Sequence, residues 1–216
     1  SDYSEDAISA RLSDPAWVAP RAMRHEKILE HFAARASIIP LRFGTIYLKR
    51  GGVERMLAER QAELRDIIER LRGKEEWGVN IFCDRVKLLE AITTLSPVLR
   101  EMSERAAAAS AGQAYLLRKK IEALRADETR AEIRRVIAEI ERELSAQSDG
   151  ATRLRVRQAE GAEHGDLSAK LAFLIERERF DDFRAGAEKL AEEREAAGFR
   201  LELTGPWPAY NFVKEG

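Results

Sequence analysis

The sequence predicts an α+β fold in two domains, the second ferredoxin-like (βαββαβ) with an enlarged helical crossover and an extended C-terminal tail. Three observations carry this prediction. From residue 76 onward the segments follow the order strand, helices, strand, strand, helix, strand, which is typical of ferredoxin-like domains. Helix-forming residues dominate one long stretch, and the chain ends in a proline-rich and aromatic-rich segment. We therefore expect domains at 1–73 and 74–204, a helical insertion at about 98–146 and a tail at 205–216.

The first domain is predicted to contain a helix, a strand and a second helix. Ser13-Asp14-Pro15 is typical of a helix start, and we expect that helix to run from about Trp17 to Ala34. Residues 37–47 are rich in β-branched and aromatic side chains and predict a strand, in which Pro40 implies an edge position or a bend. An amphipathic helix is predicted at 53–71. These elements are too few for a balanced sheet, so we expect either a domain that lacks its first strand or strands, or one that leans on the second domain.

The second domain is predicted to alternate four strands with helices. Alternating or continuous apolar runs indicate its strands, and apolar residues three and four apart indicate its helices. The long helical stretch is either a helix pair or one kinked helix, with the break near Gly112 or Asp127. In chain order we expect a strand at 76–83, a helix at 85–95, the helical stretch at 98–146, a strand at 152–157, a turn at 161–166, a strand at 170–176, a helix at 180–197 and a strand at 199–204.

The tail follows the last strand directly. Gly205-Pro206 is expected to end that strand, because proline lacks a backbone donor and fixes its φ angle. Two prolines flank Trp207, and Tyr210 and Phe212 follow. Three large rings need a covering surface, which is either the chain itself or another chain. We favour a strap, in which the rings lie across the chain's own surface and bridge the two domains.

Composition limits the classes of partner. Hydrophobic residues make up 44% and charged residues 35% of the 216 residues, as expected for a folded protein with solvated helix faces. Lys and Arg number 37 against 38 Asp and Glu, which gives a net charge of −1. A dedicated nucleic-acid or anionic-membrane binder would show a basic excess. The small net charge gives little repulsion between copies and is compatible with weak self-association.

Cysteine usage and hydropathy set the expected location. The lone Cys83 excludes an intrachain disulfide and a cysteine-based metal site, and its apolar surroundings predict a buried side chain rather than a reactive thiol. No stretch approaches the roughly 20 apolar residues of a membrane span. No signal peptide pattern is visible, so a cytoplasmic location is the default expectation.

The residues that could carry catalysis lack a suitable arrangement. His25 and His31 are six apart on a predicted helix and so lie on different faces, while His164 lies in a polar turn. No phosphate-binding loop or nucleophile elbow is present. Most carboxylates lie three or four residues from Arg or Lys, which is typical of a solvated helix face. We expect no enzyme, no catalytic residue, no metal and no cofactor; the alternative is an active site assembled from distant residues.

The first of two possible binding functions is nucleic-acid binding by the strand at 152–157. The strand at 152–157 carries Arg153, Arg155 and Arg157 on one face, which is either a charged edge that prevents aggregation or a stripe that binds phosphates. The second possibility makes a ferredoxin-like regulatory or RNA-binding module the alternative function. Against it, the predicted central strand holds Phe173 as its only ring, whereas RNA-recognition sheets display several.

The second possible function is protein binding, which is indicated by apolar and charged side chains in excess of what the predicted core requires. Apolar stripes along 98–146 either pack on each other or offer a surface to another helix. Arg42 interrupts an apolar segment, so its side chain either pairs with a carboxylate or faces a partner. The candidate partner-binding residues are Arg42, Tyr115, Trp207, Tyr210 and Phe212.

Several segments resemble one known family. They are Arg24-His25-Glu26 followed by Ile39-Pro-Leu-Arg-Phe-Gly-Thr45, then Glu76-Trp-Gly-Val-Asn80, Gly112-Gln-Ala-Tyr-Leu-Leu-Arg-Lys-Lys120 and the tail string around Gly205-Pro-Trp-Pro208. In this order, and over nearly the whole chain, they are similar to signature segments of the gas vesicle protein L/F family (GvpL/GvpF). The chain departs from the family at Ala209, where a second proline is usual, and in lacking the additional strand segment with which members usually begin.

The resemblance implies a non-enzymatic minor structural or assembly protein of gas vesicles, the gas-filled, protein-walled organelles that give prokaryotic cells buoyancy. The implied partners are the hydrophobic major shell protein, bound during vesicle nucleation or wall assembly, and other gas vesicle accessory proteins. The implied location is the gas vesicle, within the cytoplasm. No cofactor, nucleic acid or membrane is implied. Such a role is physically reasonable, because a shell subunit with a large apolar face needs an escort before assembly.

Overall fold

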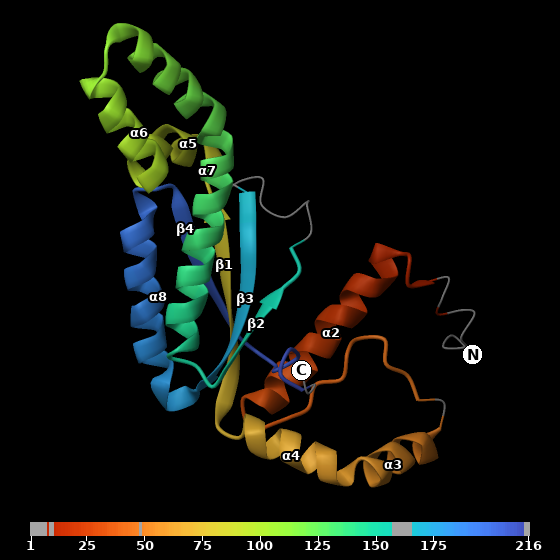
Figure 1. Ribbon diagram of the computed structural model, residues 1–216. Coiled ribbons are helices and arrows are strands. Elements are labelled where there is room, and N and C mark those ends of the chain that lie inside the picture. Colours follow the sequence, from red (N-terminus) through yellow and green to blue (C-terminus); the bar gives the residue numbers. More distant parts are fainter. Residues whose placement is uncertain (1–7, 9–10, 48, 157–165, 214–216) are drawn as a thin grey trace. The chain divides into compact units, whose positions relative to one another are not determined.

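The computed structural model describes residues 8, 11–47, 49–156 and 166–213 of the chain (Figure 1). The chain divides into two compact units, one formed by Ser1–Glu76 with Pro206–Gly216 and the other by Trp77–Gly205. The chain contains helices and a four-stranded antiparallel sheet, which confirms the predicted α+β class.

The first unit contains three described helices, α2 (Pro15–Ala33), α3 (Arg50–Glu59) and α4 (Gln61–Leu71). Asp14 caps α2, since its side chain accepts a hydrogen bond of 2.9 Å from the backbone N–H of Ala16, and Pro15 opens the helix. The single amphipathic helix predicted at 53–71 is wrong. It is divided at Arg60, whose backbone leaves the helical region and whose side chain binds Glu63 in the first turn of α4.

Residues 37–47 are irregular, so the strand predicted there is wrong. Pro40 has no backbone donor for a sheet, and Gly44 has a φ of +87° in the turn that follows. That turn is closed by Thr45, whose backbone N–H and hydroxyl both donate to the carbonyl oxygen of Arg42, at 3.1 and 2.8 Å. The β-branched residues of this segment are half-buried at Ile38 and Ile39 and exposed at Thr45 and Ile46, and none of them lies in a sheet.

The sheet has the strand order β2-β3-β1-β4. Its strands are β1 (Lys74–Cys83), β2 (Gly150–Leu154), β3 (Asp166–Glu176) and β4 (Phe199–Trp207). Strands β2 and β3 are antiparallel and pair Thr152 with Ala172. The four strands predicted for this part of the chain are all present, although their ends differ.

The prediction that Gly205-Pro206 ends the last strand is wrong, because β4 continues to Trp207. Two properties allow this. Gly205 has a φ of +128°, which residues with a side chain rarely adopt, and β4 lies at the edge of the sheet, where a proline without an N–H costs no interior ladder bond.

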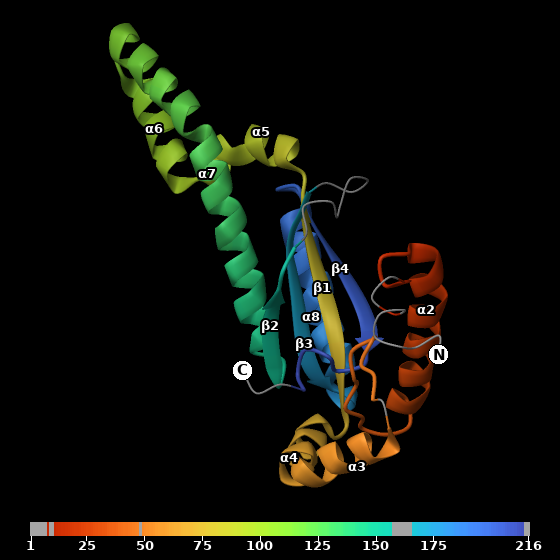
Figure 2. The same ribbon diagram turned by 90° about the vertical axis from the view of Figure 1, so that its right-hand side faces the viewer.

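The helices of the second unit are α5 (Arg85–Leu95), α6 (Pro97–Ala108), α7 (Ala111–Ser145), the 3₁₀ turn η1 (Arg177–Arg179) and α8 (Phe180–Glu195). The predicted break in the long helical stretch lies at residues 109–110, just before Gly112, and α7 is continuous through Asp127. Helices α7 and α8 lie on one face of the sheet, and α6 runs back along the first half of α7 (Figure 2). The predicted turn at 161–166 falls almost wholly outside the described residues.

The main core lies between the sheet and these two helices. Its most buried side chains include Ile81 of β1, Phe173 of β3, Ile140 of α7 and Phe183 of α8, each fully shielded from solvent. Cys83 is buried in the same core, and its burial raises the pKa of the thiol to about 11. A thiol with such a pKa is mostly protonated at neutral pH, which agrees with the predicted packing role.

Candidate functional site

The first unit exposes an unusual share of its large apolar side chains. Few of its described apolar residues are buried, chiefly Ile67 and Leu71 of α4. On α2, by contrast, Met23 is 61% exposed and Phe32 is 54% exposed. The exposed large apolar residues of this unit are Leu12, Met23, Ile28, Phe32, Leu41, Ile46, Tyr47, Leu57, Ile68 and Trp207. We call this set the apolar surface of the first unit.

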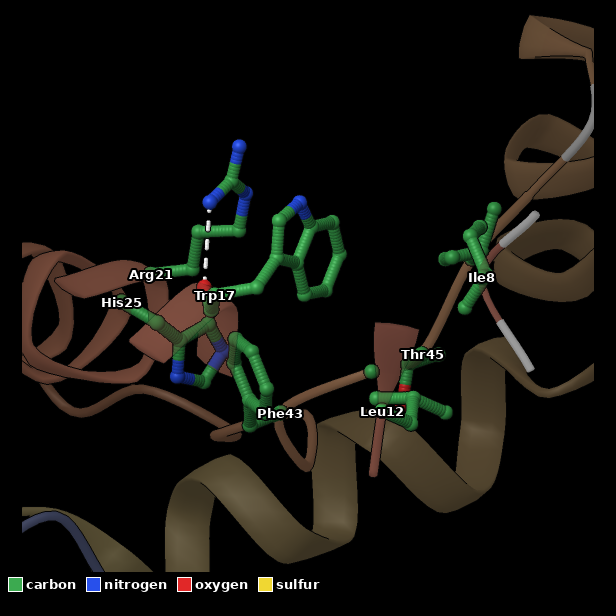
Figure 3. Close-up of a pocket in the computed structure, with 9 residues that line it drawn as sticks. Ile8, Leu12, Trp17, Arg21, His25, Phe43 and Thr45 are labelled. Carbon is green, nitrogen blue, oxygen red and sulfur yellow. Dashed lines mark hydrogen bonds between the residues drawn. The ribbon is translucent and has the colours of Figure 1, made fainter. Parts of the chain in front are cut away.

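A pocket of about 270 Å³ opens within this unit, between α2 and the irregular segment (Figure 3). Trp17 and His25 line it from the helix, and Phe43 and Ile46 line it from the irregular segment. The rings of His25 and Phe43 meet edge to face, with their centroids 5.8 Å apart. The pocket is therefore an apolar and aromatic recess of the size that small groups or side chains occupy.

Arg21 supplies the positive charge at this pocket. Its guanidinium lies 4.1 Å from the ring centroid of Trp17 and donates a hydrogen bond of 3.0 Å to the Trp17 carbonyl oxygen. This cation–π contact holds the indole against the wall of the pocket. None of the residues that line the pocket is a carboxylate, so the recess is apolar with a weakly positive rim.

The tail packs against the first unit through a buried carboxylate. Asn211 donates to Glu76 twice, from its backbone N–H to Oε2 at 3.0 Å and from Nδ2 to Oε1 at 2.5 Å. Glu76 is 4% exposed. Burial raises the pKa of Glu76, and the two bonds from Asn211 oppose part of that rise. A buried carboxylate needs such donors, so these bonds are structurally important.

Two further bonds hold the tail. The Tyr210 hydroxyl donates to Glu26 Oε1 of α2 at 2.9 Å, and Arg70 of α4 donates to the carbonyl oxygen of Phe212 at 2.9 Å. Partial burial and the neighbouring Glu26 carboxylate raise the pKa of the Tyr210 phenol. The tail thus contacts α2, the start of β1 and the end of α4, all within the first unit.

The structure separates the predicted partner-binding residues. Tyr210 and Phe212 are half-buried in the tail, and Trp207 at the end of β4 is 45% exposed. Arg42 is exposed, and within the described ranges its side chain has no ion pair. Tyr115 belongs to the second unit, near the start of α7. These five residues therefore do not form one site in a single unit.

Sequence reasoning missed the two residues that anchor the tail, Glu76 and Asn211. They are 135 positions apart, so no local pattern pairs them. A weak indication exists, since Glu76 is a carboxylate at the head of an apolar strand. Asn211 is a polar residue between Tyr210 and Phe212, where a hydrogen bond would fix the position of the two rings.

A membrane span, a metal site and a phosphate-binding stripe each require a particular arrangement of residues. No described helix is long and apolar enough to cross a membrane, and no group of three His, Cys, Asp or Glu gathers there as a metal site would require. Arg153 pairs with Glu141 of α7, Arg155 is exposed, and Arg157 lies outside the described residues. The arginine stripe is thus partly neutralised.

Exposed apolar side chains in a unit with few buried ones are typical of proteins that bind other proteins. The comparison with known families makes this specific. The profile of the gas vesicle synthesis protein GvpL/GvpF family matches residues 1–214. The chain belongs to that family, which confirms the resemblance described above.

Two curated relatives come from a Streptomyces species. Gas vesicle protein L is 28% identical over 219 residues, covering 98% of this chain and 76% of the relative. Gas vesicle protein F is 30% identical over 220 residues, covering 97% of this chain and 86% of the relative. Family members are structural or assembly proteins and are not known enzymes, so the chain has a gas vesicle-associated role.

Two crystal structures share the fold. GvpF from Microcystis aeruginosa matches with a TM-score of 0.62 at 18% identity, over 99% of this chain and 80% of that one. GvpF from Anabaena sp. PCC7120 matches with a TM-score of 0.65 at 21% identity, over 90% of this chain and 75% of that one.

Proposed function

We propose that the chain is a non-enzymatic minor structural or assembly protein of gas vesicles, which binds the hydrophobic major shell protein while a vesicle is nucleated or its wall is assembled. The observation that carries this proposal is the apolar surface of the first unit, in a chain of the GvpL/GvpF family. We place its action at the gas vesicle, within the cytoplasm. Other gas vesicle accessory proteins are further partners, and neither a cofactor, a membrane nor a nucleic acid is required.

The apolar surface suits a hydrophobic protein partner for energetic reasons. Apolar area removed from water contributes about 25 cal/mol per Å², so each large side chain buried at an interface contributes on the order of 1.5–3 kcal/mol. Helix α2 presents Met23, Ile28 and Phe32, and the irregular segment presents Leu41 and Ile46. A shell protein with an apolar face would cover such side chains, and the pocket beside Trp17 would receive one of its own.

The arrangement of the second unit supports a ferredoxin-like assignment. Its strand order is β2-β3-β1-β4, with α5, α6 and α7 between β1 and β2 and α8 between β3 and β4. That is the βαββαβ connectivity of ferredoxin-like sheets. In this assignment the pair α6 and α7 is the helical insertion of the domain at 74–204, and the tail returns to the domain at 1–73.

The proposal is tested with two exposed positions of the first unit, Phe32→Gln on α2 and Ile46→Gln at the pocket. Each change should weaken binding of the full chain to co-expressed shell protein about tenfold or more, because 1.4 kcal/mol is a factor of ten. Val86→Gln is the matched control, since Val86 is 69% exposed on α5 of the second unit.

The control should bind the shell protein as the unchanged chain does. Equal binding by all three variants would contradict the proposed surface. Gene deletion tests the role itself: a host that still makes vesicles of normal number and shape would contradict an assembly function.

A further inference from the structure

The hairpin of α6 and α7 carries an uncompensated positive charge at its tip. In the second unit this hairpin projects beyond the end of the sheet (Figure 2). Between Glu104 and Glu122 the sequence contains no acidic residue. The same stretch contains four basic residues, which are Arg105, Arg118, Lys119 and Lys120. We call residues 105–121 the hairpin tip.

The tip differs in its ion pairs from the later part of α7 and from α8. Elsewhere basic side chains are commonly bridged to carboxylates one helical turn away, as Arg135 is to Glu132 and Glu139. Just beyond the tip, Arg125 pairs with Glu122. Within the described residues, none of the four basic side chains of the tip has an ion pair. A chain of net charge −1 therefore concentrates free positive charge at one place.

Two exposed apolar side chains lie among these cations. Tyr115 is 60% exposed and Leu116 is 67% exposed, while Ala114 is buried toward α6. At about 100° per residue, the outer arc of α7 reads in the order Arg118, Tyr115, Lys119, Leu116, Lys120. The Lys119 ammonium lies 6.0 Å from the centroid of the Tyr115 ring. Cations and apolar groups thus alternate around one face.

The start of α7 adds to the positive potential. Its first turn contains no acidic residue, and the described Ser110 side chain makes no capping bond to the first backbone N–H groups. Free N–H groups at a helix N-terminus carry partial positive charge. The N-terminus of α7 and the basic side chains of the tip therefore both attract an anionic group.

We propose that the hairpin tip binds a short acidic segment of a partner protein, which also carries an aliphatic or aromatic side chain. The inference rests on the proposed function, in which the partner is another gas vesicle protein. Carboxylates of the segment would pair with Arg118, Lys119 and Lys120, and its apolar side chain would pack against Tyr115 or Leu116, on one side of Lys119. In such an interface the charged groups attract the acidic segment and increase its association rate, and the apolar groups add buried contact area.

The dimensions favour a short peptide segment over a longer polyanion. Residues 111–121 extend about 15 Å along the helix, the span of roughly five extended residues. Glu104 and Glu122 bound the tip and would repel a strand of nucleic acid whose charge continues past it. A membrane-binding face needs a continuous apolar stripe, whereas Lys119 lies between Tyr115 and Leu116.

The test uses the full chain and a fluorescent model peptide of alternating Glu and Leu, with a Gln and Leu peptide of equal length as the neutral probe. The Glu peptide should bind in fluorescence anisotropy, and binding should weaken as salt is raised from 50 to 500 mM. Lys119→Glu should reduce affinity about tenfold, and Leu116→Gln should reduce it to a smaller extent. Arg134→Glu is the matched control, an equal charge reversal at an exposed position about four turns further along α7.

Four results would overturn the proposal. They are no binding of the Glu peptide, equal binding of the neutral peptide, equal losses in Lys119→Glu and Arg134→Glu, and tighter binding of a single-stranded RNA or of anionic vesicles than of the Glu peptide. Thermal unfolding of each variant by circular dichroism shows whether the fold is kept.

Failure of this inference is distinguishable from failure of the proposed function. If the tip variants bind the peptide like the unchanged chain while Phe32→Gln loses the shell protein, the tip inference alone is wrong. If the tip variants lose the peptide while Phe32→Gln keeps the shell protein, the tip inference stands and the proposed shell-binding surface is wrong.

Discussion

Replacing Asn211 by Ala should make the tail open more often from the rest of the first unit. The change removes the bond from Asn211 Nδ2 to Glu76 Oε1, while the backbone N–H can still donate to Oε2. A hydrogen bond to a charged group contributes about 1.5–3 kcal/mol. Loss of one such bond should therefore increase the equilibrium constant for tail opening about 10-fold to 150-fold.

The loss of stability caused by Asn211→Ala should depend on pH. Burial raises the pKa of Glu76 above its ordinary 4.5, so the folded state binds the proton more tightly than the unfolded state does. Stability contributed by this group is therefore present at low pH and is lost as pH rises from the ordinary pKa through the raised one. Asn211→Ala removes a bond that favours the ionised form, so its cost should be larger at pH 7 than at pH 4.

Hydrogen exchange followed by mass spectrometry measures this opening directly, through the protection of a peptide that spans residues 205–213. The control is Asn80→Ala at the chain's other asparagine, which lies in β1 within the second unit. Protection that is unchanged in Asn211→Ala, or reduced equally at both pH values, would refute the assigned role of the Glu76 carboxylate.

Three further changes test other parts of the structure. Truncation after Thr204 should lower the melting temperature or solubility, whereas an unchanged melting temperature with lost shell-protein binding would make the tail a recognition element. Gly198→Ala should lower unfolding free energy by about 1–2 kcal/mol in urea titration, because Gly198 has a φ of +89° and a Cβ would lie 3.0 Å from the Asp84 carbonyl oxygen; an unchanged midpoint would contradict this. Phe183→Ala should cost about 3–5 kcal/mol in the same assay, since Phe183 is fully buried, and a loss below 1 kcal/mol would contradict its core position.

Sequence patterns predicted well those elements whose ends are encoded locally. Asp84 and Ser96 cap the two helices that follow them, and each side chain accepts the backbone bonds expected of a cap. Gly198, with its positive φ, marks the turn between α8 and β4. Such features need only a few neighbouring residues, so they are visible without the fold.

Patterns failed where exposure or distant contacts decide the outcome. The β-branched run at 37–47 resembles a strand because propensity cannot distinguish a strand from an irregular segment with partly buried apolar residues. The bond between Tyr210 and Glu26 joins residues 184 positions apart, and no periodicity reports it. Tyr115 was identified as a candidate, but the free charge around it became apparent only when the ion pairs of the other helices were known.

The position of the tail bears on how the chain is made. Residues 206–213 provide the partners of Glu26, Arg70 and Glu76, and they leave the ribosome only after the second unit has been synthesised. Strands β1, β2 and β3 and most of β4 precede residue 206, so the second unit, Trp77–Gly205, can fold as a body during synthesis. The first unit therefore obtains its last segment only after the second unit has been synthesised, and until then its apolar side chains lack the contacts of the tail. A chaperone or a partner protein can therefore reach the apolar side chains of residues 8–76 for as long as the second unit is being synthesised.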